Sequence, residues 1–154
     1  MTQQIQQFAV LAGEFCAWAE SAGAAPEVEA STALRLLSSL YQKALELPPT
    51  TGQQEPAEVA DEAWKRVYER FGSLPFNYYA QCFDPGQSPG EASLADLADD
   101  LADIWRDLKG GLSLYAAGHV ESAAWEWRQM FRHHWGLHAA GAIYALHFWQ
   151  SQQD

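Results

Sequence analysis

Apolar residues recur every three or four positions along most of this chain, and this spacing constrains the fold more than any other feature. In residues 93–112 they fall at Leu94, Leu97, Leu101, Ile104, Trp105, Leu108 and Leu112. Because a helix has 3.6 residues per turn, these side chains share one face, as in the seam of a helical bundle. Ser93, with Asp96 three positions on, has the pattern of a capping box, so we expect this helix to begin at Ser93.

The same periodicity predicts further helices over about residues 3–21, 26–47, 56–72, 120–135 and 137–152. Residues 73–91 are rich in proline and glycine but hold four aromatic residues, so we expect a long loop that packs on the bundle, with a short helix at about 76–81. We find no alternation typical of strands. We predict an all-α fold, a single helical domain over residues 1–154: a bundle of about six helices with one long aromatic-rich loop at about 73–91.

The net charge of −11 excludes the basic surfaces through which proteins bind nucleic acids and anionic membranes. A basic protein or a bound cation are the partners that this charge favours. Two cysteines, Cys16 and Cys82, are too few for a disulfide framework. The N-terminal sequence MTQQIQQFAV lacks the basic region of a signal peptide, and no apolar run approaches the ~20 residues that span a bilayer. We therefore expect a soluble protein of the cytoplasm, of undetermined oligomeric state.

Five aspartates, which we call the acidic stripe, lie on the polar face of the helix expected at 93–112. They are Asp96, Asp99, Asp100, Asp103 and Asp107, and helical geometry places them within roughly a 100° arc. Like-charged pairs three or four residues apart cost about 0.2–0.5 kcal/mol each. The helix dipole offsets this cost near the N-terminus but not at Asp103 and Asp107. A local cost without local compensation indicates a place where function is expected.

The stripe has a structural interpretation and a functional one. It is either a solvated or internally paired polar face, or a site for a divalent cation such as Mg²⁺ or Mn²⁺, which prefer carboxylate oxygens. A complete cation site needs ligands from a second helix, and the sequence offers Glu14, or Glu121 and Glu126.

The histidines form a second candidate set. His134 and His138 have the i, i+4 spacing of a two-histidine metal pair. Gly136 lies between them and can end or kink the helix, which would void the spacing, so we interpret both as satisfied packing residues. His147 lies among apolar residues, and we expect it to be buried.

Four stretches of the chain resemble a family of small bacterial proteins classed as a domain of unknown function: GEFCAW, LLSSLYQKALELP, DDLADIWRDLK and FRHHWGLHAAGAIYALH. The family pattern consists of five short motifs: Glu-aromatic-Cys, Leu-Tyr-x-Lys-Ala, D-L-A-D-I-aromatic-x-D-L-K, Trp-Gly and Ala-Leu-His. In this chain the motifs fall on Glu14, Phe15, Cys16, Tyr41, Asp100, Asp103, Asp107, Trp135, Gly136 and His147. The resemblance implies an all-helical bacterial cytosolic protein and no activity. Because His134 and His138 fall outside the pattern, it narrows the candidate metal ligands to Asp100, Asp103, Asp107 and Glu14.

Two functions are compatible with these patterns. We expect a non-enzymatic protein-interaction module that docks a partner, such as a basic protein, through the acidic stripe or the loop at 73–91. The alternative is a divalent-metal site that acts on a phosphoester or nucleotide, with Asp100, Asp103, Asp107 and Glu14 holding the ion. The two differ in one geometric respect: the metal site requires ligands from two helices to meet.

Overall fold

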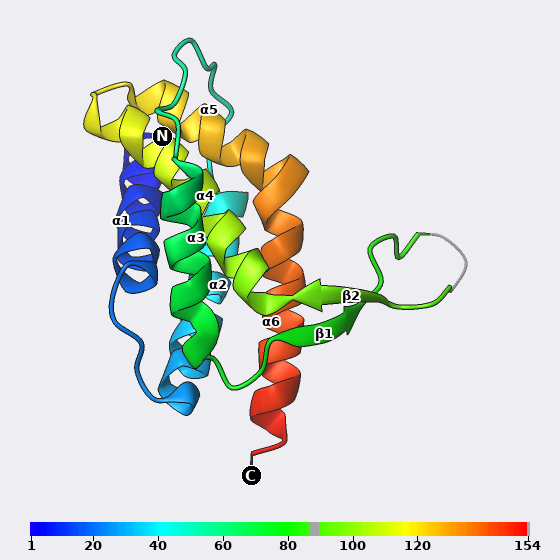
Figure 1. Cartoon of the computed structure of the whole chain (residues 1–154). Coiled ribbons are helices and arrows are strands. Elements are labelled where there is room, and N and C mark those ends of the chain that lie inside the picture. Colours follow the sequence, from blue (N-terminus) through cyan, green and yellow to red (C-terminus); the bar gives the residue numbers. More distant parts are fainter. Residues whose placement is uncertain (87–89, 154) are drawn as a thin grey trace.

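Helix α4 (Leu97–Ala116) runs through the centre of the molecule and packs mainly against α1, α3, α5 and α6. Figure 1 shows the arrangement in a computed structural model that describes residues 1–86 and 90–153. The predicted helical bundle is confirmed. The remaining elements are α1 (Thr2–Ala19), α2 (Pro26–Leu45), α3 (Asp61–Arg70), η1 (Phe71–Ser73), β1 (Tyr78–Gln81), β2 (Ser93–Asp96), α5 (Val120–Met130), η2 (Phe131–Trp135) and α6 (Gly136–Ser151).

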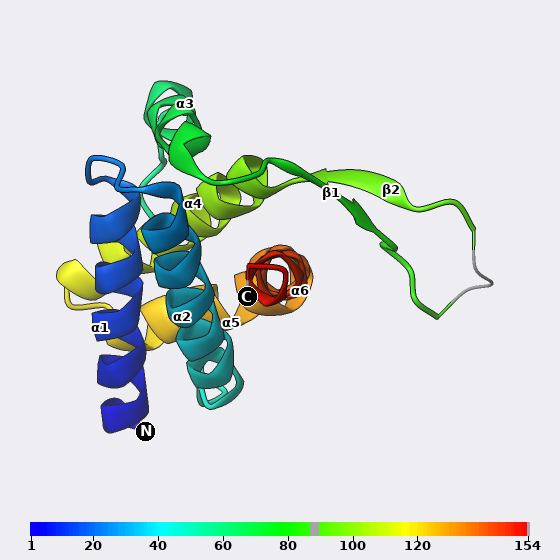
Figure 2. The ribbon, with the colours of Figure 1, turned by 90° about the horizontal axis from the view of Figure 1, so that it is seen from below.

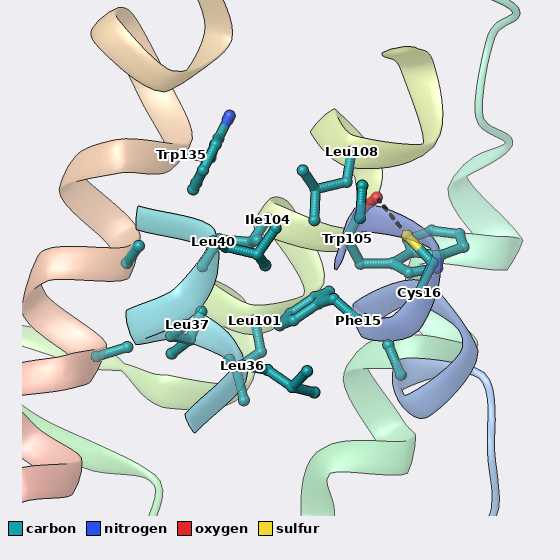
Figure 3. Packing of buried hydrophobic residues seen from close by; sticks show 14 of the residues in the cluster. Phe15, Cys16, Leu36, Leu37, Leu40, Leu101, Ile104, Trp105, Leu108 and Trp135 are labelled. Carbon is teal, nitrogen blue, oxygen red and sulfur yellow. Dashed lines mark hydrogen bonds between the residues drawn. The ribbon is translucent and has the colours of Figure 1, made fainter. Parts of the chain in front are cut away.

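The apolar stripes predicted from the sequence meet in one core between these helices. Figure 3 shows Phe15 from α1, Leu37 from α2 and Leu101 from α4 in this core, and each of these side chains is fully buried. Cys16 is buried as well, as expected of a small core residue. Within the described residues, no helix combines the length and the apolar character needed to cross a bilayer.

The prediction that the chain has no strands is wrong. Residues 78–81 and 93–96 form an antiparallel hairpin in which Tyr79 pairs with Ala95, so the short helix expected at 76–81 is a strand. Seen from below in Figure 2, the hairpin projects from the helical body. Its far end is the central part of the loop expected at 73–91, of which residues 87–89 lie outside the described residues.

Helix α4 therefore begins at Leu97 instead of Ser93, because the capping group is Asp96. The Asp96 side chain accepts hydrogen bonds from the backbone N–H groups of Ala98 and Asp99, at 3.0 and 3.2 Å. These bonds satisfy amides that a helix start leaves without partners. Ser93, the residue expected to cap the helix, pairs with Gln81 in the hairpin.

The helix expected at 56–72 also begins later, at Asp61. The backbone N–H of Ala57 donates instead to the Ser113 hydroxyl of α4, at 2.9 Å. A side chain outside the segment thus satisfies an amide that a helix would otherwise use, and residues 56–60 lie outside the helix.

Gly136 does not break the chain's last long helix. Its φ and ψ of −62° and −39° are helical. The π-helical segment η2 joins α5 to α6 without a gap, although the helix changes direction sharply there (Figure 2). In the π turn the carbonyl of Phe131 comes so close that a Cβ at position 136 would lie 2.3 Å from it. Glycine is thus required for this close approach, and the spacing of His134 and His138 is preserved.

A buried ion pair ties α3 to the other helices. Arg70 is bonded to Glu29 of α2, and their side chains are only 10% and 2% exposed. Arg70 also donates to the Trp18 carbonyl at 3.1 Å, and its guanidinium lies over the Trp18 ring. Burial raises the pKa of Glu29, but the hydrogen bond and charge of Arg70 outweigh it and leave that pKa below its ordinary value.

We predict that Arg70→Met lowers the free energy of unfolding by about 3–5 kcal/mol, because it leaves a buried carboxylate unpaired. The matched control is Lys43→Met, which removes the cation of the more exposed Lys43–Glu46 pair and is expected to cost less than about 1 kcal/mol. Urea unfolding measures both values.

The Arg70→Met deficit should shrink in acid. Because the folded pKa of Glu29 is lowered, the wild type loses the contribution of the pair as pH falls through that folded pKa, below 4.5. In Arg70→Met the buried Glu29 carboxyl has no cation beside it and is more easily protonated. Acid therefore lowers the free energy of unfolding less in the variant than in the wild type. A deficit that stayed constant down to the folded pKa would contradict this assignment.

Candidate metal centre

Three aspartates of the acidic stripe are buried instead of solvated. Asp100, Asp103 and Asp107 are 5%, 9% and 9% exposed, although they lie on the polar face of α4. A buried carboxylate is stable only with hydrogen-bond or ionic partners. The stripe is therefore not a solvated face at these three positions, and its partners define the site.

Two histidines, one in η2 and one in α6, are partners of two of these aspartates. His134 Nδ1 lies 2.6 Å from an oxygen of Asp107, and His138 Nδ1 lies 2.7 Å from an oxygen of Asp100. The two rings are 4.8 Å apart between centroids. Since each Nδ1 faces a carboxylate, each imidazole is fixed in orientation, and its Nε2 is the nitrogen left to act elsewhere.

Both Nε2 atoms converge on Asp103. They lie 3.5 Å (His134) and 3.7 Å (His138) from Asp103 Oδ2. Three ligand atoms bound at about 2.1 Å to one ion would be about 3.0–3.4 Å apart in octahedral or tetrahedral geometry, so the three groups would have to move closer together to hold an ion. Among the described residues Asp103, His134 and His138 bring their ligand atoms within 4.8 Å of one another.

The second oxygen of Asp103 is held by other groups. Trp64 Nε1 of α3 donates to Asp103 Oδ1 at 2.8 Å, and Arg106 donates to the same oxygen at 2.7 Å. Asp103 is therefore fixed so that Oδ2 alone faces the histidines. This arrangement presents one carboxylate oxygen and two imidazole nitrogens to a common point.

The hairpin supports the site through Tyr79. The Tyr79 hydroxyl donates to Asp100, the carboxylate that orients His138. Burial and the bond to Asp100 raise the pKa of Tyr79, so it stays a donor. The hydroxyl reaches Asp100 past Gly141 of α6, where a Cβ would lie 2.8 Å from it and 2.7 Å from Gln81 Nε2.

Negative charge is crowded around these groups. Burial raises the pKa of Asp107 despite its hydrogen bond to His134, and burial together with Asp103 raises the pKa of Asp99. The hydrogen bond to Asp100 raises the pKa of His138. The site thus favours an added positive charge, either protons on the imidazoles or a bound cation.

The sequence-predicted ligands separate into two groups. Of the four, only Asp103 belongs to the cluster of possible ligand atoms in the described residues. Asp100 and Asp107 lie beside it but are bonded to the two histidines, and Glu14 is exposed on α1. Of the other carboxylates considered, Glu121 is exposed, and the half-buried Glu126 lies near enough to Asp107 for their charges to interact.

The sequence predicted that a second helix would supply carboxylate ligands, but the segments that face α4 here, η2 and α6, supply the imidazoles of His134 and His138. Sequence reasoning set His134 and His138 aside, although their i, i+4 spacing was the signal that could have found them. It gave no signal for Trp64 and Tyr79. His147, expected to be buried, is exposed.

Comparison with known proteins agrees with this fold. A family model described as a domain of unknown function, DUF5063, matches residues 1–152. The crystal structure of protein BF1032 from Bacteroides fragilis is similar, with a TM-score of 0.77, 24% sequence identity, and coverage of 94% of this chain and 90% of that chain. At that identity the likeness shows the fold alone. None of the curated proteins matches the chain.

We predict that Gly141→Ala leaves the protein about 1–3 kcal/mol less stable to unfolding than Gly13→Ala, because the added methyl overpacks the contact with Tyr79 and Gln81. Gly13→Ala is the matched control: it is also helical, and its Cβ would meet no atom within 4 Å. That change should raise stability by up to about 1 kcal/mol. Equal effects of the two changes in urea unfolding would show that the hairpin does not pack as described.

Proposed function

As this chain belongs to the DUF5063 family, defined as a domain of unknown function, we propose its function from its own side chains. It binds a divalent transition-metal ion through Asp103, His134 and His138. The bound ion acts on a phosphoester or nucleotide. The observation that carries this proposal is the convergence of two oriented Nε2 atoms on one free carboxylate oxygen.

The surrounding bonds have the pattern found around histidines that bind metals. Such a histidine donates its other ring N–H to a carboxylate or carbonyl, which fixes the tautomer and makes the ligand nitrogen more basic. Asp107 does this for His134, and Asp100 does it for His138. Two separate carboxylates in this role, both buried on α4, support a metal site over a set of unrelated ion pairs.

The ligand set favours transition metals over the Mg²⁺ considered from the sequence. Imidazole nitrogen suits Zn²⁺, Fe²⁺, Co²⁺ and Mn²⁺, whereas Mg²⁺ prefers oxygen ligands. Two histidines and one carboxylate also leave coordination positions open. The histidines are 34% and 25% exposed in their side chains, so a water or a substrate can reach these positions.

An ion held in this way supplies a water of lowered pKa and polarises a phosphoryl oxygen. A hollow of about 760 Å³ lies on the side of Asp103 that Trp64 and Arg106 cover. Its charged lining combines Lys65 and Arg106 with the aspartates Asp61, Asp96, Asp99 and Asp103, and neither histidine lines it. The proposed substrate, a phosphoester or nucleotide, therefore rests on the chemistry of the ion and on the nearby positive charge of Lys65.

Docking of a basic protein on the acidic stripe has less support. Asp100, Asp103 and Asp107 are buried and bonded within the chain, so they offer little free charge to a partner. Only Asp96 and Asp99 of the stripe are partly exposed, and Asp96 already caps α4.

We predict that metal stabilises the wild type and not His134→Ala/His138→Ala. At a free metal concentration of 100 times the dissociation constant, Zn²⁺, Co²⁺ or Mn²⁺ should add about 2.7 kcal/mol to the free energy of unfolding. The measurement is thermal unfolding with and without each metal, with Mg²⁺ and Ca²⁺ as comparisons. Activity of the loaded protein on phosphomonoesters and nucleotides is then screened.

The control for this experiment is His133→Ala/His147→Ala, which removes two exposed histidines and should keep the full metal effect. If none of the metals stabilises the wild type, or if both double variants lose the effect equally, the metal centre does not exist. Metal binding without turnover of phosphoesters would support the metal centre but reject a phosphoester or nucleotide as its substrate.

We also predict that Asp100→Asn and Asp107→Asn each weaken metal affinity about 10–100-fold, because each replaces the charged acceptor that orients a ligand histidine with a weaker, neutral amide oxygen. Asp61→Asn, at an exposed position of the same hollow, removes the same charge and should change affinity less than threefold. Isothermal titration calorimetry with Zn²⁺ measures the three values. Equal losses in all three variants would mean that general electrostatics, not orientation, determines affinity.

A further inference from the structure

The face of the molecule between β1 and α6 carries a groove whose lining differs from the rest of the surface. It has a volume of about 480 Å³, and six of its nine described lining residues are aromatic. None of these nine residues is charged, in a chain with 29 lysine, arginine, aspartate and glutamate residues. Ligand pockets are typically 300–1,000 Å³ and mainly apolar with a few polar groups.

Two aromatic side chains on α6 stand out of the surface along this groove. Tyr144 is 72% exposed and Phe148 is 61% exposed, and Tyr79 of β1 borders the groove from the hairpin. Exposed aromatic residues along a hollow offer flat apolar area and ring contacts to a ligand. The absence of charge in the described lining makes the groove complementary to an uncharged molecule and a poor place for an ion.

Tyr79 connects this groove to the candidate metal centre. Its side chain lines the groove, and its hydroxyl donates to Asp100. Asp100 in turn holds His138 Nδ1 at 2.7 Å. A ligand that packs on the Tyr79 ring therefore contacts a residue that is linked through Asp100 to His138, a proposed metal ligand.

We propose that the groove between β1 and α6 binds an uncharged aromatic small molecule, and that Tyr79 couples its occupancy to metal affinity. The coupling rests on the proposed metal centre, whereas binding in the groove does not. A filled groove restricts the Tyr79 ring, keeps its hydroxyl on Asp100 and so holds His138 ready for the ion. Coupling of this kind is reciprocal, so metal also tightens binding in the groove.

Binding is tested with N-phenyl-1-naphthylamine, an uncharged aromatic probe whose fluorescence rises in apolar surroundings. Its affinity for the full chain should fall at least tenfold in Tyr144→Ala/Phe148→Ala. Leu137→Ala is the control, because Leu137 is a 52% exposed apolar residue of the same helix that does not line the groove. Equal affinity in the wild type and the double variant overturns the proposal.

The ligand class is tested with a matched probe. 8-Anilinonaphthalene-1-sulfonate has the same anilinonaphthalene skeleton and one negative charge. With no cation in the described lining and a net charge of −11, the sulfonate should bind at least tenfold more weakly than the uncharged probe. Equal or tighter binding of the sulfonate overturns the assignment to uncharged ligands.

The coupling is tested by titrating Zn²⁺ with and without saturating N-phenyl-1-naphthylamine. In the wild type the probe should tighten Zn²⁺ binding at least fivefold, and in Tyr79→Phe, which keeps the ring and removes the hydroxyl, the effect should vanish while the probe still binds. An unchanged Zn²⁺ affinity in the wild type overturns the coupling. If Zn²⁺ does not bind at all, the proposed metal centre fails, and the first two titrations still decide on the groove.

Discussion

The need to satisfy three buried carboxylates on one helix organises this molecule. Asp100, Asp103 and Asp107 lie on α4, and their partners come from every side: Trp64 from α3, Tyr79 from β1, His134 from η2 and His138 from α6. An unpaired buried charge is expensive, and breaking such a pair costs several kcal/mol. The aspartates thus specify how the hairpin, α3, η2 and α6 are arranged around α4, while apolar burial supplies the driving force for folding.

Much of the fold could be predicted from the sequence, because the apolar period of a helix is a local signal. The apolar positions predicted for α4, from Leu97 to Leu108, are buried. The hairpin could not be predicted in the same way. Ser93 to Asp96 matches a helix start by its side chains, and only pairing with Tyr78–Gln81, across a long loop, makes it a strand. A local sequence pattern does not predict a strand that depends on pairing with a distant segment.

The site was predictable to the extent that it violated a local rule. Five aspartates that repel one another on a helix indicated an unusual face, and three of them, Asp100, Asp103 and Asp107, are buried. Their histidine partners are about 27–38 positions away, and nothing local relates the two segments. The π turn at Phe131–Trp135 also disguised the pair, since Gly136 resembles a helix end in the sequence although the helix continues through it.

Helix α3 has the weakest attachment of the helices, and this affects how the molecule opens. Of its ten residues, all of them described, only Val67 is buried, whereas α4 buries thirteen. Segments with little apolar burial open at a lower free energy than the whole protein. Opening of α3 alone would remove Trp64 from Asp103 and Arg70 from Glu29 together, so a local opening of this helix would also release the central carboxylate.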